Sequence, residues 1–340
     1  MCARYLGDAN RSLFFYESGT YGAGSGTGQW IGLVQNSTID ESTGVIPVRY
    51  MGTNTRNVDQ WVDGPKDVNG TISFFPQDWK FLFFALGSNV DSGSPSPYIH
   101  TISELNSGSM SAFTSGTLSP FTSFQVEDGK KTVGGAGQQF VRTVRGCNVN
   151  TFTLNAAQGE IITCDVDYVG QDVLFTSGNP TAVTETTTRP FMWRDVRVHI
   201  PSGTVINEVK SLSLTINNNL EVPHYLNGSQ VTAAPIPLSR DYEVSVTLDT
   251  TSENTKTFWE SYFAGGSILN QGTGSEFNMM LEINASTGSR DAFFVFSGCK
   301  MMDVELPSPM EGVNETTLTI TPKNMVAVVS DAIELYNPWA

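Results

Sequence analysis

Cysteine, histidine and long apolar runs are all scarce in this sequence, and each scarcity excludes a class of protein. The four cysteines include no Cys-x-x-Cys pair, and the three histidines have no metal-ligand spacing. We therefore expect buried, reduced thiols, and neither a disulfide framework nor a metal site. No window reaches the roughly eighteen consecutive apolar residues of a membrane-spanning helix. Residues 1–6 lack the apolar core of a secretory signal, so we expect assembly in a cytoplasm and no membrane partner.

Basic residues are scarce as well. Lysine and arginine together number 19 against 34 acidic residues, which gives a net charge of −15. Such a surface repels the phosphates of nucleic acid, so the composition argues against tight nucleic-acid binding. Excess acid with few lysines also fits a salt-loving host, and the choice between a bacterial and a halophilic archaeal host stays open.

Sequence motifs of common enzymes are missing too. There is no G-x-S-x-G, H-E-x-x-H or Walker-type pattern. The glycine-rich residues 19–28 lead into an apolar strand pattern and not into a Lys-Ser/Thr helix start, so they do not form a phosphate-binding loop. We predict a protein without catalytic activity and without cofactors.

The residues that are abundant favour strands and turns. Threonine, serine, glycine and asparagine are frequent, and valine, isoleucine, phenylalanine and tyrosine stand in short runs. In residues 162–168 apolar positions alternate with Thr163, Asp165 and Asp167, which predicts a strand with one buried and one wet, acidic face. Acids two apart on an exposed strand face are more typical of a solvated surface than of a catalytic pair.

One pattern occurs twice along the chain. Residues 277–306 read as an apolar strand, a turn-rich loop, a second apolar strand, Gly298-Cys299 and a closing segment. Residues 121–154 give the same order around Gly146-Cys147, and in both copies a leucine follows seven residues after the cysteine. This indicates an internal repeat, in which the two cysteines are matched apolar packing positions.

A short helix precedes each copy. Residues 76–87 begin with proline and end with glycine, and residues 254–264 carry aromatic side chains at helical spacing. The stretch 88–120 is rich in serine, glycine and proline. We predict a long loop there, an insertion in the first copy that holds at most a weak strand at residues 98–102.

The repeat divides the chain into two predicted domains. Residues 176–190 lack an apolar period and are the best candidate for a linker. We therefore expect a mainly β protein with a first domain at residues 1–185 and a second at residues 186–340. Each domain is expected to be a β-sandwich with one short flanking α-helix.

The closing region of each copy resembles that of tail tube proteins of long-tailed, non-contractile bacteriophages and archaeal viruses. In the first copy the resemblance lies in Gly-Cys-Asn-Val-Asn-Thr-Phe-Thr-Leu at 146–154, then Gly159 and Val-Asp-Tyr-Val-Gly at 166–170. The second copy, residues 298–306 followed by Gly312 and residues 318–321, resembles it more loosely, because two methionines replace Val-Asn.

The resemblance implies a structural virion protein of the tail. Copies would join sheet to sheet into rings, and rings would stack into a tube that conducts the genome from capsid to host. A duplicated subunit implies a homotrimer ring with pseudo-hexameric symmetry. Expected partners are further copies of the chain and the tape measure, tail terminator and distal tail proteins, while double-stranded DNA passes through without specific binding.

Two sets of residues are candidates for this role. Thr163, Asp165 and Asp167 are candidates for the lumen face, although the same face could equally be the outer solvent face. The hairpin loops at 127–138 and 284–290 could reach a neighbouring subunit or ring. Their candidate contact residues are Lys130, Lys131, Asn284 and Arg290.

Other classes of protein remain open from sequence alone. A glycan-binding β-sandwich adhesin or a surface-layer protein has a similar composition. A jelly-roll capsid or decoration protein is another virion alternative, although jelly rolls usually lack the repeated helix.

Overall fold

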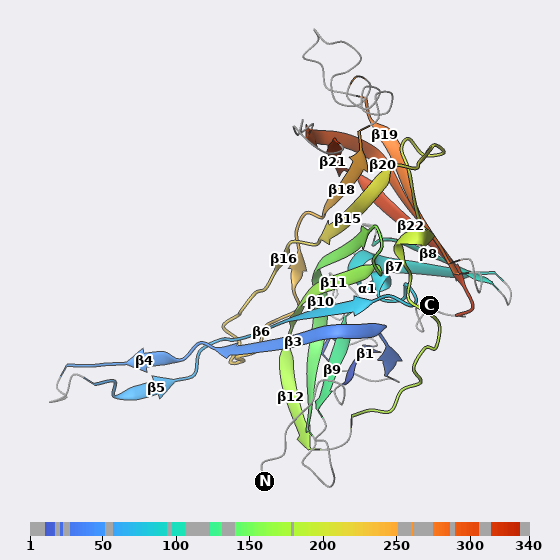
Figure 1. Ribbon diagram of the computed structural model, residues 1–340. Helices are drawn as coiled ribbons and strands as arrows, with labels where there is room; N and C mark the ends of the chain where they lie inside the picture. Colours follow the sequence, from blue (N-terminus) through green and yellow to red (C-terminus); the bar gives the residue numbers. More distant parts are fainter. Residues whose placement is uncertain are drawn as a thin grey trace.

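The computed structural model is built mostly of antiparallel strands (Figure 1). The structure describes residues 11–17, 21–22, 28–51, 57–93, 97–105, 123–130, 140–177, 180–250, 260, 275–285, 290–305 and 314–333. The predicted mainly β, sandwich-type fold is confirmed. The second predicted helix, at residues 254–264, lies outside the described residues apart from Glu260.

A central sheet runs through both halves of the chain. Its order is β3 (Leu33–Thr43), β6 (Lys66–Phe75), β11 (Thr163–Gly170), β10 (Phe140–Ala157), β15 (Val209–Asn217), β18 (Asp241–Asp249), β21 (Glu315–Thr321) and β20 (Arg290–Glu305). The pairing of β10 with β15 joins strands of the first half to strands of the second.

Two outer sheets share the long strands β10 and β20 with the central sheet. The first has the order β2 (Gln29–Trp30), β1 (Arg11–Tyr16), β9 (Phe124–Lys130), β10 and β12 (Asp172–Ser177). The second has the order β14 (Val205–Ile206), β13 (Val196–His199), β19 (Phe277–Ala285), β20, β22 (Asn324–Asp331), β8 (Tyr98–Glu104) and β7 (Gly87–Ser92).

The repeated Gly-Cys marks the point where each long strand changes sheets. β10 pairs with β9 up to Cys147 and with β11 from Asn148 onward, and β20 makes the same change at Cys299. The preceding Gly146 and Gly298 have φ of +63° and +61°, values that favour glycine. Both cysteines are fully buried at these crossings, and burial raises the pKa of the Cys299 thiol to about 11. The thiols therefore serve as packing groups, as predicted.

The first predicted helix exists but is short. α1 (Leu82–Leu86) is buried along its whole length and ends at Gly87, which has φ of +101°. Phe81 and Phe84 make edge or tilted ring contacts with Phe14 of the first outer sheet and with Phe124. Phe81 also contacts Phe74 of the central sheet, so the aromatic cluster fills the space between the two layers.

The stretch at residues 88–120 contains more strand than predicted. The weak strand expected at residues 98–102 is present as β8, but it also pairs with β7 in a hairpin and along its length with β22 of the second half. The strand pattern is weak because His100, fully buried, occupies one of the two core positions of β8, together with Ile102. Residues 106–122 lie outside the described part of the chain.

The predicted linker is an irregular segment that contacts the first half. After β12, residues 180–190 form no strand. Thr181 donates to both carboxylate oxygens of Glu127, and the Gln77 side chain donates to the carbonyls of Thr186 and Thr188. The short helix η3 (Trp193–Asp195) then leads into β13.

Candidate assembly surfaces

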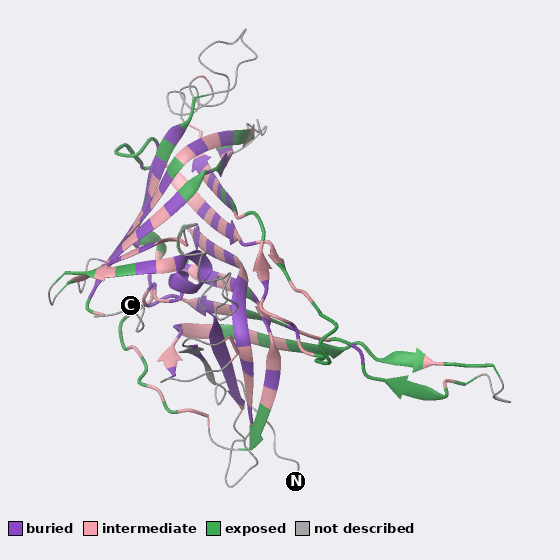
Figure 2. Ribbon diagram, turned by 180° about the vertical axis from the view of Figure 1, so that it is seen from behind, coloured by how far each residue is buried: buried purple, intermediate pink, exposed green. Residues whose placement is uncertain are grey.

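One face of the central sheet is polar across all eight strands. Strand alternation buries Cys164, Val166 and Tyr168 and turns Thr163, Asp165 and Asp167 to the other side. Figure 2 shows this alternation as bands along the strands. The described pairings align on this polar face Asn36, Thr38, Asp40, Asn69, Thr71, Ser73, Thr163, Asp165, Asp167, Thr151, Thr153, Asn155, Ser211, Ser213, Thr215, Glu243, Ser245, Thr247, Thr317, Thr319, Asp303 and Glu305.

A row of hydrogen bonds orders the polar face. The Ser73 hydroxyl donates to Asp165 at 2.5 Å, and the Asn155 amide donates to the other Asp165 oxygen at 3.3 Å. The Ser213 hydroxyl donates to Asn155 at 2.8 Å, so the row crosses from the first half into the second. Partial burial and the neighbouring Asp165 raise the pKa of Asp167. The three candidate residues thus lie together on one ordered, acid-bearing surface.

A long arm leaves the central sheet at the end of β3. It comprises residues 44–65, of which 52–56 lie outside the described residues, and contains β4 (Ile46–Val48) and β5 (Gln60–Val62) (Figure 1). Ile46 lies opposite Val62 on one face, and Trp61 lies opposite Pro47 on the other. Trp61 is 66% exposed and Met51 98% exposed. A two-stranded ribbon with apolar side chains on both faces is marginally stable alone and is typical of an interaction site.

The arm is not among the elements predicted from the sequence. Its ribbon is only three residue pairs long and its apolar residues face solvent, so it lacks the alternation of a half-buried strand. The pairs Val45-Ile46 and Trp61-Val62, on either side of turn-forming residues, were the available hairpin signal.

The second half has a connection at the equivalent place, which folds back. This brace, residues 218–240, links β15 to β18 as the arm links β3 to β6, and includes β16 (Leu220–Glu221) and β17 (Ile236–Pro237). It contacts the base of the arm: the Lys66 amide donates to the Gln230 carbonyl at 2.9 Å, and His224 lies 2.9 Å from Asp67. Gln171 donates to the Thr232 carbonyl. The brace therefore fixes the arm's base to the body.

Of the four predicted hairpin contacts, Asn284 and Arg290 lie on paired strands of one hairpin, and Lys130 lies on β9 of the other outer sheet. The Lys130 ammonium lies 5.9 Å from the Phe140 ring centroid, and Lys131 lies outside the described residues. Asn284 pairs with Asp291 across the second hairpin. Arg290 donates to the carbonyls of Gln77 and Arg189 and lies over the Phe191 ring, so it fastens the second-half hairpin to the first half of the same chain.

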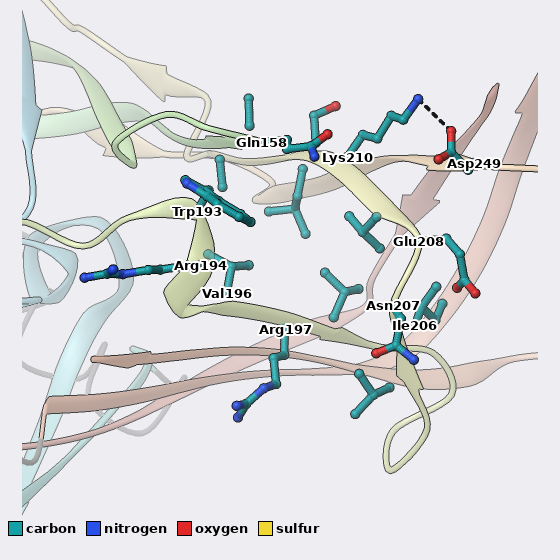
Figure 3. Close-up of a pocket in the computed structure, with 17 residues that line it drawn as sticks. Gln158, Trp193, Arg194, Val196, Arg197, Ile206, Asn207, Glu208, Lys210 and Asp249 are labelled. Carbon is teal, nitrogen blue, oxygen red and sulfur yellow. Dashed lines mark ion pairs between the residues drawn. The ribbon is translucent and has the colours of Figure 1, made fainter. Parts of the chain in front are cut away.

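A cavity lies where the two halves meet, at the end of the central sheet opposite the arm. We call this cavity, of about 400 Å³, the seam pocket. Trp193, Arg194 and Arg197 lie on one side of it, and Lys210, Glu208 and Asp249 on the other (Figure 3). The Lys210 ammonium is 2.6 Å from Asp249, which also lines the pocket, and 2.7 Å from Glu315, so it forms ion pairs with both acids.

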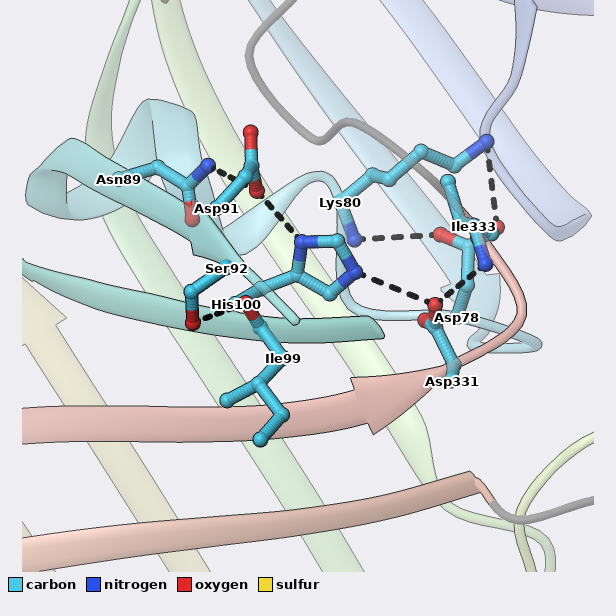
Figure 4. A network of polar contacts seen from close by, with 9 residues as sticks. All are labelled: Asp78, Lys80, Asn89, Asp91, Ser92, Ile99, His100, Asp331 and Ile333. Carbon is cyan, nitrogen blue, oxygen red and sulfur yellow. Dashed lines mark hydrogen bonds and ion pairs between the residues drawn. The ribbon is translucent and has the colours of Figure 1, made fainter. Parts of the chain in front are cut away.

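Buried charges fasten the β7–β8 hairpin to β22 (Figure 4). His100 Nδ1 lies 2.5 Å from Asp91 and its Nε2 lies 3.3 Å from Asp331, so both ring nitrogens face carboxylates. Burial lowers the pKa of His100, but the contacts with Asp331 and Asp91 outweigh it and raise the pKa. Burial also raises the pKa of the nearby Asp78 despite the adjacent Lys80. The His100 imidazole thus contacts one carboxylate from each half of the chain.

Sites of other kinds are not found in the described part of the chain. No group of three or more histidine, cysteine, aspartate or glutamate side chains there could hold a metal ion. Within the same residues, no helix has the length and apolar character needed to cross a membrane.

Comparison with known proteins identifies the family of the chain. No curated protein matches the chain. A family model described as phage tail tube protein matches residues 9–308, which is most of the chain. The match accounts for the β-rich fold and for an assembly role, and it favours a structural tail protein over an adhesin. The chain belongs to the phage tail tube protein family.

Proposed function

We propose that this tail tube protein is internally duplicated and forms rings of three chains with pseudo-sixfold symmetry. The carrying observation is the strand order of the central sheet. β3, β6, β11 and β10 of the first half are followed by β15, β18, β21 and β20 of the second. β3 corresponds to β15 and β10 to β20, because each stands at the same place in its half and the long strands share the Gly-Cys crossing.

The strand pairing that joins the two halves of one chain provides a template for the pairing between neighbouring chains. β10 pairs with β15 through residues 151–157 and 211–217. The described residues leave β3 and the Asp303–Glu305 end of β20 at the two edges of the central sheet. If β20 of one chain pairs with β3 of the next as β10 pairs with β15, the sheet continues from chain to chain. A head-to-tail contact of this kind generates a ring when its rotation closes.

The polar face then becomes the inner wall. Thr163, Asp165 and Asp167 would line the lumen with the other hydroxyl and carboxylate side chains of this face. Acidic and neutral groups repel or ignore DNA phosphates, so double-stranded DNA slides past without specific binding. The net charge of −15 supports this assignment, and the opposite face is unsuitable because it is packed against the outer sheets.

Stacking of rings completes the tube. The arm presents its apolar residues beyond the edge of the central sheet, where an adjacent ring would cover them. The hairpin containing Lys130 and Lys131 is a second candidate contact between subunits. The tape measure, tail terminator and distal tail proteins are the expected partners inside the tube and at its ends, in the virion tail.

Electron microscopy of the purified chain tests this proposal. Negative-stain images should show rings or hollow tubes with a threefold repeat. Uniform monomers over a wide range of concentration and salt would refute the tube assignment. Deleting residues 130–137 tests the hairpin separately: shortened or absent tubes would support that contact, and unchanged tubes would exclude it.

A further inference from the structure

We infer that the arm of one chain docks into the seam pocket of a chain in the adjacent ring. This inference rests on the proposed stacking of rings and names the surface that receives the arm. The occupant is a second copy of this chain, through the face of the arm that carries Asp59, Trp61 and Asp63.

The register of the central sheet places the arm and the seam pocket at opposite ends of the strands. The arm follows Thr43 of β3, which pairs with Lys66 at the start of β6. At the other end of the same strands, Phe74 pairs with Cys164, Asn155 with Thr163 and Ala157 with Ser211. The seam pocket is lined by Ala156, Ala157 and Ser211, so it lies at this far end. Rings stacked in one orientation therefore bring arms toward pockets.

The numbers of arms and pockets also match. The connection equivalent to the arm in the second half is the brace, which is folded against the first half. Among its described residues, each chain thus has one projecting arm. It also has one junction of β10 with β15, and the seam pocket lies beside that junction. One arm for one pocket leaves neither surface unused.

The chemistry of the two surfaces is complementary. Residues 59, 61 and 63 alternate with Gln60 and Val62, so two carboxylates flank the Trp61 ring on one face of the arm. Exposed Trp193 and Val205, each about two-fifths exposed, line the pocket beside Arg194 and Arg197. An arginine over an indole ring is a favourable cation–π pair, and arginine–carboxylate contacts add hydrogen bonds.

The size of the pocket is suitable for side chains. Its volume of about 400 Å³ lies within the roughly 300–1,000 Å³ of sites that enclose a small ligand. The ion pairs of Lys210 hold the opposite wall in place, while Arg197 is paired with Glu282 at 2.9 Å and still 59% exposed. Arg194 is the cation we expect to receive the arm, with Arg197 beside it.

A charge exchange between two chains tests the inference. Arg194→Glu and Asp63→Arg should each leave rings intact and reduce the proportion of multi-ring tubes roughly tenfold or more, as expected for a central contact. A double variant that carries both Arg194→Glu and Asp63→Arg should restore tubes, because the arm and the pocket again have opposite charges. Trp193→Ser should act like Arg194→Glu, and Lys323→Glu, which reverses an exposed cation away from the pocket, should have no effect.

The outcomes separate this inference from the proposed function. Absence of rings and tubes in the unchanged protein would refute both. Normal tubes from the unchanged protein together with normal tubes from Arg194→Glu and Trp193→Ser would refute the pocket as acceptor alone. Loss of tubes in Trp61→Ser but not in Trp193→Ser would show that the arm docks elsewhere. The thermal unfolding of each variant is compared with that of rings of the unchanged protein. An unchanged unfolding temperature together with a loss of tubes indicates lost stacking, and a lowered one indicates a folding defect.

Discussion

The arm and the brace occupy equivalent places in the two halves, yet they do different things. Both connect neighbouring strands at the same end of the central sheet. The arm projects with apolar side chains on both faces, whereas the brace lies against the arm's base and bonds to Lys66 and Asp67. The paired strands of the sheet keep the same order in each half, and the connections diverge. Assembly of the sheet and specialisation of its loops are therefore separable properties.

The largest expected effect comes from removing one of the two connections. Replacing residues 45–63 with a short Gly-Ser turn should abolish tubes and keep rings. The two strands of the arm, β4 and β5, pair only with each other among the described residues, so β3 and β6 stay in the central sheet without them. Shortening the brace between residues 222 and 235 should instead loosen the arm's base and destabilise the ring itself. Electron microscopy of both variants distinguishes these outcomes. Equal loss of rings in both would contradict the separation of roles.

The second prediction concerns His100, which joins a first-half hairpin to a second-half strand. His100→Leu would leave Asp91 and Asp331 buried without the imidazolium between them. Removing one partner of a buried ion pair typically costs about 3–5 kcal/mol in the free energy of unfolding. Urea unfolding at matched protein concentration measures the loss. A cost below about 1 kcal/mol would mean that the carboxylates are already neutral.

The same cluster should make stability depend on pH. Because the pKa of His100 is raised on folding, its contribution is complete below the ordinary value of about 6.5 and is lost as the pH rises through the folded value. Asp78, whose pKa is raised by burial, also faces the cluster and would lose stability in the same direction as the pH rises. Wild type should lose stability on the alkaline side, and His100→Leu should show a smaller loss, the difference being the contribution of the histidine.

The third prediction compares the two Gly-Cys crossings. A Cβ at Gly146 would lie 2.8 Å from the Tyr21 ring and from Gln171, whereas a Cβ at Gly298 would meet only the flexible side chain of Lys323. Both positions have positive φ, which costs other residues about 1–2 kcal/mol. Gly298→Ala should cost about that amount, and Gly146→Ala about 1–3 kcal/mol more because of crowding. Equal effects on thermal unfolding would show that the crossings tolerate a Cβ alike.

The smallest expected effect distinguishes the β10–β15 junction within a chain from the proposed β20–β3 junction between chains. Thr153 pairs with Thr215 at the β10–β15 junction. The equivalent positions at the β20–β3 junction are Glu305 and Asp40. Like charges opposite each other on a sheet are unfavourable by up to about 1 kcal/mol, and salt screens them. Ring formation should therefore strengthen with salt, and Glu305→Gln should reduce that dependence. Asp303→Asn, opposite the position of Ser42, is the matched control. An unchanged salt dependence in Glu305→Gln would contradict this register.

The sequence allowed prediction of the features that recur in both halves. Alternation predicted the strand carrying Thr163, Asp165 and Asp167, and the spacing around Cys147 and Cys299 predicted the repeat before the structure explained it as a sheet crossing. Within residues 88–104 the sequence predicted only a weak strand, which is β8, and not its pairing with β7, because a histidine takes a core position. The arm was missed because no described part of the chain covers its apolar residues. In both cases the local alternation of apolar and polar residues does not reveal the hairpin.

A three-dimensional reconstruction of the assembled tube by electron cryomicroscopy would locate the strands at the ring junctions and the residues that line the lumen. We expect three chains in each ring, with β20 of one chain hydrogen-bonded to β3 of the next and the polar face turned to the lumen. A ring in which β3 and β20 face solvent, or in which Asp165 and Asp167 lie on the outer surface, would contradict this arrangement.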